Sequence, residues 1–167
     1  VTLLGGPWPL VGGAVALALV NAATLALAGR PWGITYGFAL WGAKLAGLAG
    51  VDVAHWPFWQ NESALASSLL SDATSVMNFG LMLGAAAAAG LAGAYAPQMK
   101  IPARSLLAAA LGGLLMGVGA RLATGCNIGA FFSGLASGSL HGLVWAIVAF
   151  GGVMLGARLR PWFGLSR

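Results

Sequence analysis

Long stretches without a charged side chain dominate this sequence and set the first limit on its fold. Residues 9–28 are uncharged, and so are all 36 residues from Leu122 to Ala157. Hydrophobic residues make up 59% of the 167-residue chain and charged residues only 7%, whereas a soluble domain has about 25% charged residues. About 20 apolar residues suffice for a helix to cross a bilayer. The sequence therefore predicts an all-α polytopic membrane protein with about five hydrophobic segments in a single transmembrane domain, residues 1–167.

The few charges are segregated along the chain. All three acidic residues fall within residues 52–72, and no Lys or Arg lies between Lys44 and Lys100. Because short cytoplasmic loops are enriched in Lys and Arg, this pattern predicts a multi-pass protein with an outside loop over residues 51–72. The predicted spans are residues 9–28, 33–50, 73–97, 105–122 and 140–157.

Single polar residues refine these boundaries. Arg30 is expected to end the first span on the cytoplasmic side, and Lys44 is expected either to snorkel to a membrane face or to point into the protein. Asn61 is expected to cap a short surface helix that reaches residue 70. Asp72, or the serine before it, is expected to cap the third span.

The interval from Leu122 to Ala157 is too short for two ordinary spans and too interrupted for one straight helix. One crossing uses about 20 residues, and the remainder contains four glycines and Asn127. This pattern predicts a helix–break–short helix element at residues 105–138. Gly125 is expected to end the first helix in a left-handed conformation, and Asn127 is expected to cap the short helix.

This break contains the residues whose chemistry indicates a ligand. A short helix that begins inside a membrane presents N–H groups to an anion, Arg121 adds a positive charge, and Cys126 supplies a soft sulfur. The combination suits a small anion that carries sulfur. A lone cysteine forms neither a metal cage nor a redox pair, so no metal and no cofactor are expected. The predicted substrate pathway comprises Cys126, Asn127, Gly125, Ile128, Gly129 and Arg121.

Each of these residues also has a structural interpretation. A lone cysteine in an apolar helix is often an inert hydrophobic side chain, and an arginine near the end of a span often snorkels to the membrane face. Four further polar residues are candidates for the pathway: Asn78, Ser75, Ser133 and His141. For His141 a bond to a helix-end carbonyl is favoured over ligand binding, and for Asn78 a bond between helices is favoured.

Several function classes do not fit the sequence. A disulfide-forming enzyme needs a second cysteine, and a metal-cation channel needs an acidic residue within a predicted span. The net charge of +5 rests on too few charged residues to form a nucleic-acid-binding patch. We therefore expect neither an enzyme nor a nucleic-acid partner, and the chain's immediate surroundings are expected to be the lipid bilayer.

The segment GARLATGCNIGAFFSGLASGSLHG, residues 119–142, resembles the Gly-Cys signature of the YeeE/YedE family of sulfur-transport membrane proteins. The stretch RPWGIT, residues 30–35, and the hydropathy of the whole chain support this resemblance. The resemblance implies a protein of about twice this length, with two related halves in an hourglass-like bundle, of which this chain is the C-terminal half. It also implies a location in the bacterial inner (cytoplasmic) membrane and thiosulfate uptake through a relay of thiol contacts in which Cys126 takes part.

One departure from the family pattern shapes the expected partners. The family's relay uses several cysteines, and this chain has one. Either the others lie in an N-terminal half, which fits a first residue that is Val rather than Met, or this member works differently. If the chain were the whole protein, a second subunit would be expected to complete the pathway. The alternative hypothesis is a membrane subunit that delivers sulfur, as a persulfide, to a soluble sulfurtransferase or scaffolds it. Other sulfur or selenium species remain open as substrates.

Overall fold

The computed structural model of the protein describes residues 8–60, 63–97 and 101–163, which form helices and connecting segments with no strand. The chain divides into two compact units, Val1–Tyr95 and Ala96–Arg167. The α-helices are α1 (Leu10–Ala28), α2 (Thr35–Leu48), α3 (Ala73–Leu91), α4 (Ala103–Leu122), α5 (Ser133–Ala136) and α6 (Leu140–Leu159). Short helical turns are η1 (Ser63–Leu65), η2 (Leu69–Ser71), η3 (Asn127–Phe132) and η4 (Arg160–Phe163). The predicted all-α class is confirmed.

Four helical stretches are long and apolar enough to cross a membrane. They are Leu10–Ala28, Ala73–Leu91, Ala103–Ala136 and Leu140–Phe163. At most 17% of the residues in their apolar windows are buried inside the protein, so most of their Leu, Val, Ile and Phe side chains face outward. In water such a surface would be costly, whereas lipid tails solvate it. The chain is therefore a membrane-embedded protein.

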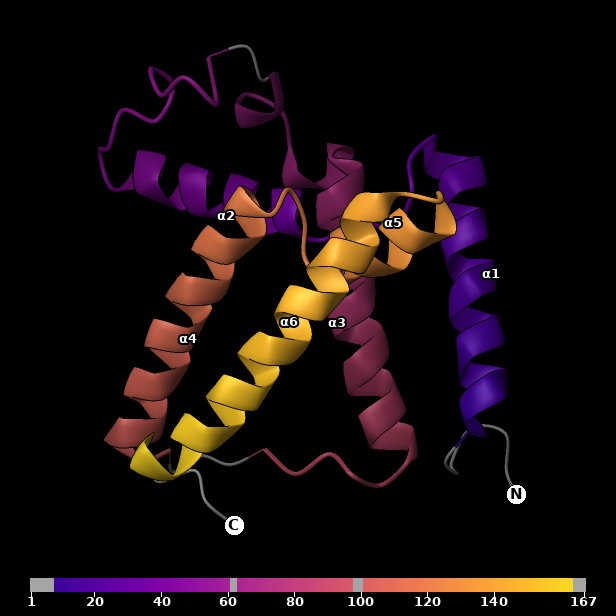
Figure 1. Cartoon of the computed structure of the whole chain (residues 1–167). Coiled ribbons are helices and arrows are strands. Elements are labelled where there is room, and N and C mark those ends of the chain that lie inside the picture. The colour runs from indigo at the N-terminus through magenta and orange to yellow at the C-terminus, as the bar shows by residue number, and fades with distance from the viewer. Residues whose placement is uncertain (1–7, 61–62, 98–100, 164–167) are drawn as a thin grey trace. The chain divides into compact units, whose positions relative to one another are not determined.

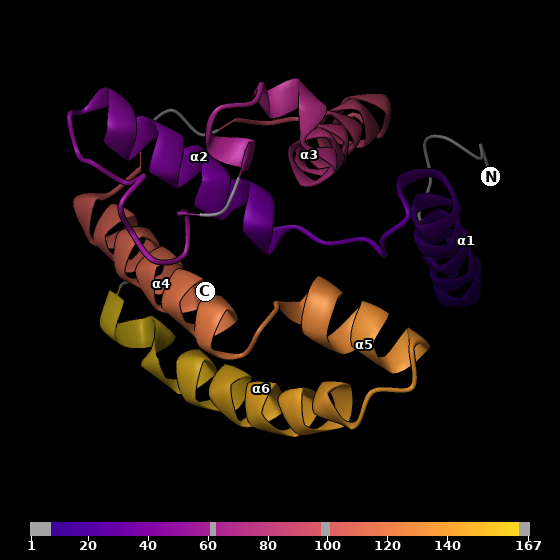
Figure 2. The same ribbon diagram turned by 90° about the horizontal axis from the view of Figure 1, so that it is seen from above.

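In the first unit, two long helices are connected through a shorter helix that is roughly perpendicular to both. Helices α1 and α3 run in opposite directions, and α2 lies crosswise at the end where α1 finishes and α3 begins (Figure 1 and Figure 2). Its 14 residues extend about 21 Å at 1.5 Å per residue, short of the roughly 30 Å hydrocarbon core. The predicted helix within residues 33–50 is present, but it is too short to be a span.

This length changes the predicted topology. When α1 and α3 both cross the membrane, residues 29–72 stay on one side of it, because α2 does not cross. In that arrangement Arg30 shares a side with the acidic loop, which differs from its predicted place on the opposite, cytoplasmic side. The hydropathy of residues 33–50 predicts one crossing more than the four candidate spans, since a Gly-rich apolar stretch of 18 residues does not show where its helix ends.

The loop that follows α2 folds back over it. Val53 and Trp59 pack with Leu40 and Ala43 of α2 in a small buried cluster. The Nζ group of Lys44 donates hydrogen bonds to two backbone carbonyls of the loop, those of residues 65 and 67, each 2.7 Å away. Lys44 thus points toward the protein, which was one of its two predicted orientations.

The ends of the segment 61–97 differ in part from the prediction. Asn61 lies outside the described residues, and the helix expected up to residue 70 is replaced by the turns η1 and η2. Asp72 caps α3 as predicted, since its Oδ2 accepts a 2.7 Å bond from the N–H of Ser75. Helix α3 ends at Leu91 rather than at residue 97, because left-handed Gly93 (φ 65°) terminates it.

The second unit contains the predicted break. Helices α4 and α6 run in opposite directions, and η3 with α5 lies at the end where α4 finishes and α6 begins (Figure 1). Both η3 and α5 pack against α6. The helix–break–short helix element predicted at residues 105–138 is therefore confirmed, and the candidate site lies at its break.

Candidate functional site

The last turn of α4 ends in a compact cap whose key residue is Thr124. The N–H of Thr124 bonds to the carbonyl of Arg121 (3.3 Å), and the N–H of Gly125 bonds to the carbonyl of Ala120 (2.9 Å). These are the two bonds of a Schellman motif, in which one residue takes the left-handed conformation. That residue is Thr124 (φ 50°), so the prediction that Gly125 ends the helix in this way is wrong. A left-handed β-branched residue costs about 1–2 kcal/mol, which the surrounding contacts must offset.

Gly125 is required for a different reason, a close approach of the chain to itself. A Cβ atom on Gly125 would lie 2.8 Å from the backbone N of Ala130, and its φ of 156° also disfavours a side chain. The same N–H of Ala130 donates a 2.7 Å bond to the carbonyl of Cys126. The missing side chain at Gly125 therefore lets η3 fold tightly back over the break.

Cys126 is the last extended residue before the short helix. Its backbone (φ −103°, ψ −170°) places it at the N-cap position of η3, and the residue is partly exposed. An N-cap residue needs extended dihedral angles, and here Cys126 has them. Asn127 is instead an exposed residue of the first helical turn, so its predicted position as the cap is wrong. Ile128 and Gly129 follow, half-buried, ahead of the buried Ala130.

The short helix itself is irregular. Segment η3 is a π-helix, and the N–H of buried Ser133 closes it on the carbonyl of Ile128, five residues back. Single π-helical turns are rare and occur frequently at functional sites. The N–H groups of residues 127–129 precede the first hydrogen bond of this segment and are directed out of its start.

The first turn of α6 contacts both sides of the break. The Nε2 atom of His141 lies 2.8 Å from the carbonyl oxygen of Ala123 and 3.4 Å from Thr124 Oγ1. The next residue, Gly142, is buried, and a Cβ there would lie 3.0 Å from the carbonyl oxygen of Ala130. The predicted bond from His141 to a helix-end carbonyl is confirmed. The sequence analysis did not predict the packing role of Gly142, although Gly142 directly follows His141 at the end of the Gly-Cys segment.

Arg121 lies exposed on the last turn of α4. A cation there interacts favourably with the negative end of the helix dipole. It lies one turn before the break, and its contribution to an anion site stays a prediction.

The other two predicted polar residues belong to the first unit, where they join helices. Ser75 and Asn78 are fully buried on α3. Trp41 Nε1 donates to Ser75 Oγ (2.8 Å), and Asn78 Nδ2 donates to the carbonyl of Ile34 just before α2 (3.1 Å). Gly37 of α2 makes room for this contact, since a Cβ there would lie 2.6 Å from Asn78 Nδ2. The favoured interpretation of Asn78, a bond between helices, is confirmed, and no sequence pattern pointed to its partners.

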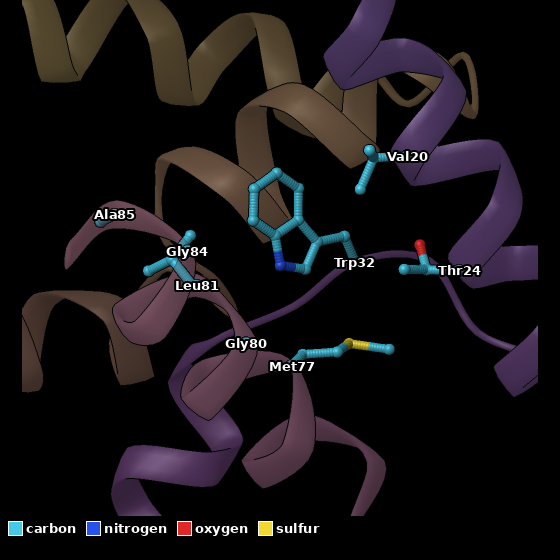
Figure 3. A pocket seen from close by; sticks show the side chains of 8 residues that line it. All are labelled: Val20, Thr24, Trp32, Met77, Gly80, Leu81, Gly84 and Ala85. Carbon is cyan, nitrogen blue, oxygen red and sulfur yellow. The ribbon is translucent and has the colours of Figure 1, made fainter. Parts of the chain in front are cut away.

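A groove runs between α1 and α3 in the same unit. It has a volume of about 340 Å³, and the indole of Trp32 and the side chain of Met77 lie along it (Figure 3). The backbone N–H of Trp32 is held by Asn21 Oδ1 at 3.0 Å. The lining is mainly apolar, and Gly80 and Gly84 of α3 form part of its wall.

Comparison with known proteins assigns the family. The family described as Sulphur transport matches residues 1–155. The "Probable transporter YedE" of Escherichia coli (strain K12) is 32% identical over 151 residues, and that of Salmonella typhimurium is 30% identical over 151 residues. Each alignment covers 90% of this chain and 37% of the relative. The "Thiosulfate transporter TsuA" of Spirochaeta thermophila is 46% identical over 56 residues, 34% of this chain and 17% of the relative.

The chain thus spans little more than a third of the length of the two YedE relatives. No solved structure gives a significant match. The family match covers both described units, including the Cys126 break. The chain belongs to the Sulphur transport family.

Proposed function

We propose that this chain is part of an importer that carries thiosulfate across the bacterial inner membrane, and that the thiol of Cys126 contacts the substrate on its way. The family assignment supports transport of a sulfur compound. One relative is named a thiosulfate transporter, which supports the choice of thiosulfate. The observation that carries the residue assignment is the position of Cys126, partly exposed at the break between α4 and η3.

The chemistry of the break matches the two ends of thiosulfate. The terminal sulfur is soft and polarisable and accepts a weak S–H···S contact from the thiol, with no covalent bond formed or broken. The oxygens are hard acceptors, and the N–H groups of Asn127, Ile128 and Gly129 at the start of the short helix are suitable donors. Sulfate lacks the soft end, so the thiol favours thiosulfate over sulfate.

The charge pattern supports the direction of transport. With four crossings, the residues beyond α3 and α6 lie on one side of the membrane, and the positive-inside rule makes that side cytoplasmic. Arg104 at the start of α4, Arg158 in the last turn of α6 and Arg160 just after it lie at that end of the crossings. Arg121 then ends its crossing on the outer side, one turn before Cys126. A positive charge there raises the local concentration of an incoming anion.

Growth complementation tests the proposal. The complete gene is expressed in bacteria that take up neither sulfate nor thiosulfate, with thiosulfate as the sole sulfur source. Growth is expected for the unchanged protein and for Ser137→Ala, a small substitution near the break. Cys126→Ala is expected to abolish growth at equal membrane abundance. Unchanged growth of Cys126→Ala would reject the site. Loss of growth with full uptake of labelled thiosulfate would favour delivery to a soluble sulfurtransferase instead.

A further inference from the structure

The two sides of the break in the second unit are fixed by neighbouring residues of one helical turn. His141 contacts the carbonyl of Ala123 at the end of α4, while Gly142 packs against the carbonyl of Ala130 in η3. One turn further along α6, the ring of Trp145 stacks on the ring of Phe131 in η3, with 6.0 Å between the ring centroids. Gly142 and Trp145 therefore pack against η3, whereas His141 contacts the end of α4.

The chemistry of the His141 contact identifies which ring nitrogen carries a proton. A carbonyl oxygen only accepts hydrogen bonds, so Nε2 must be the donor to Ala123. The imidazole thereby satisfies a carbonyl at the helix end, one of the acceptors that an α-helix leaves without an intrahelical partner. It also lies beside the left-handed Thr124, whose unfavourable backbone needs support from its surroundings.

The other side of the imidazole is open. His141 is exposed and lines a groove of about 270 Å³ together with Ala123, Val144 and Trp145. The ring can therefore leave the carbonyl without displacing a packed neighbour. Between Ala123 and Cys126 lie only Thr124 and Gly125, so release of the carbonyl frees the segment that presents the thiol.

We propose that His141 is a positioning residue that holds the α4 end of the break and thereby sets the exposure of the Cys126 thiol. That this positioning matters for transport rests on the proposed function, in which the Cys126 thiol contacts the substrate. The positioning itself is independent of any substrate, because it concerns only the contact between His141 and Ala123. Cys126 touches the substrate, and His141 acts through the backbone of residues 123–126.

A reach-matched pair of variants separates hydrogen bonding from bulk. His141→Gln places an amide N–H about as far along the side chain as Nε2 and keeps the bond to Ala123. His141→Asn carries the same amide but falls short of the carbonyl, and His141→Leu keeps bulk without a donor. The rate of alkylation of Cys126 by N-ethylmaleimide is measured in membranes containing the complete protein, with mass spectrometry reading out Cys126 alone.

The alkylation rate of His141→Gln is expected to stay within about twofold of the unchanged protein. His141→Asn and His141→Leu are expected to alter it roughly fivefold, the factor that loss of one neutral hydrogen bond gives. Equal rates in all four proteins would overturn the proposal, as would equal effects of Gln and Leu. Thermal unfolding in detergent identifies a variant that fails to fold. If His141→Leu fails to fold, the alkylation rates of His141→Gln and His141→Asn are compared instead, and equal rates overturn the proposal. Thiosulfate uptake by Cys126→Ser separately tests the proposed function, so failure of one leaves the other measurable.

Discussion

Replacement of Gly142 by alanine tests the packing that shapes the Cys126 break. A Cβ atom at this position would lie 3.0 Å from the carbonyl oxygen of Ala130, 3.1 Å from the backbone N of Leu135 and 3.3 Å from Leu135 Cγ. Two of these atoms belong to the backbone and cannot rotate away. Overpacking of this kind costs about 1–3 kcal/mol.

The helix propensity of alanine works in the opposite direction and needs a control. Alanine is favoured over glycine in a helix interior by about 1 kcal/mol. Gly151 lies in the same helix, and a Cβ atom there would have no described neighbour within 4 Å, so Gly151→Ala gains the propensity term alone. The difference between the two variants isolates the steric cost, about 1–3 kcal/mol in the free energy of unfolding.

Thermal unfolding of the purified complete protein in detergent measures this difference. Gly142→Ala is expected to unfold at a lower temperature than Gly151→Ala, by roughly 2–4 °C for each kcal/mol. Thiosulfate uptake is expected to fall in Gly142→Ala and to stay unchanged in Gly151→Ala. Equal unfolding temperatures for the two variants would refute the close packing of α6 on the short helix.

Substitutions at three further positions test the first unit. Gly37→Ala is expected to destabilise the protein by about 1–3 kcal/mol in thermal unfolding, because its Cβ would lie 2.6 Å from Asn78 Nδ2. Asp72→Ala removes the cap of α3 and is expected to cost about 1 kcal/mol, whereas Asp72→Asn retains most of that stability. Lys44→Met removes two hydrogen bonds to loop carbonyls and is expected to speed proteolytic cleavage within residues 63–71. An unchanged cleavage rate would show that these hydrogen bonds do not hold the loop.

The sequence was sufficient for the features that depend on composition and spacing. Uncharged stretches of about 20 residues predicted the long helices, and the glycines after Leu122 predicted the break, because both are local properties of the chain. The family resemblance came from the segment around Cys126 and agrees with the family match.

The details of the break depend on contacts between residues far apart in sequence. Thr124 rather than Gly125 takes the left-handed conformation, and Gly125 is instead required by its contact with Ala130. The bond from His141 joins two residues 18 positions apart. Local propensities do not depend on such contacts. The residue types therefore predicted a break, but not which residue takes the left-handed conformation or which one is required by close packing.

The crosswise helix α2 shows the same limit in the first unit. Its sequence is apolar enough to resemble a span, yet it ends at Leu48 after 14 residues, where left-handed Gly50 follows. The loop that covers it supplies carbonyl partners for Lys44, which makes the charge compatible with an apolar helix. Hydropathy alone does not distinguish a short covered helix from a crossing.

Uptake of sulfur-labelled thiosulfate into membrane vesicles measures directly whether the Cys126 thiol takes part in transport. The complete protein and its Cys126→Ser variant are compared at equal abundance, with no soluble partner present. Cys126→Ser is expected to lower the initial rate of uptake at least roughly tenfold, which corresponds to a barrier higher by at least about 1.4 kcal/mol. An unchanged rate in Cys126→Ser would contradict the role of the thiol.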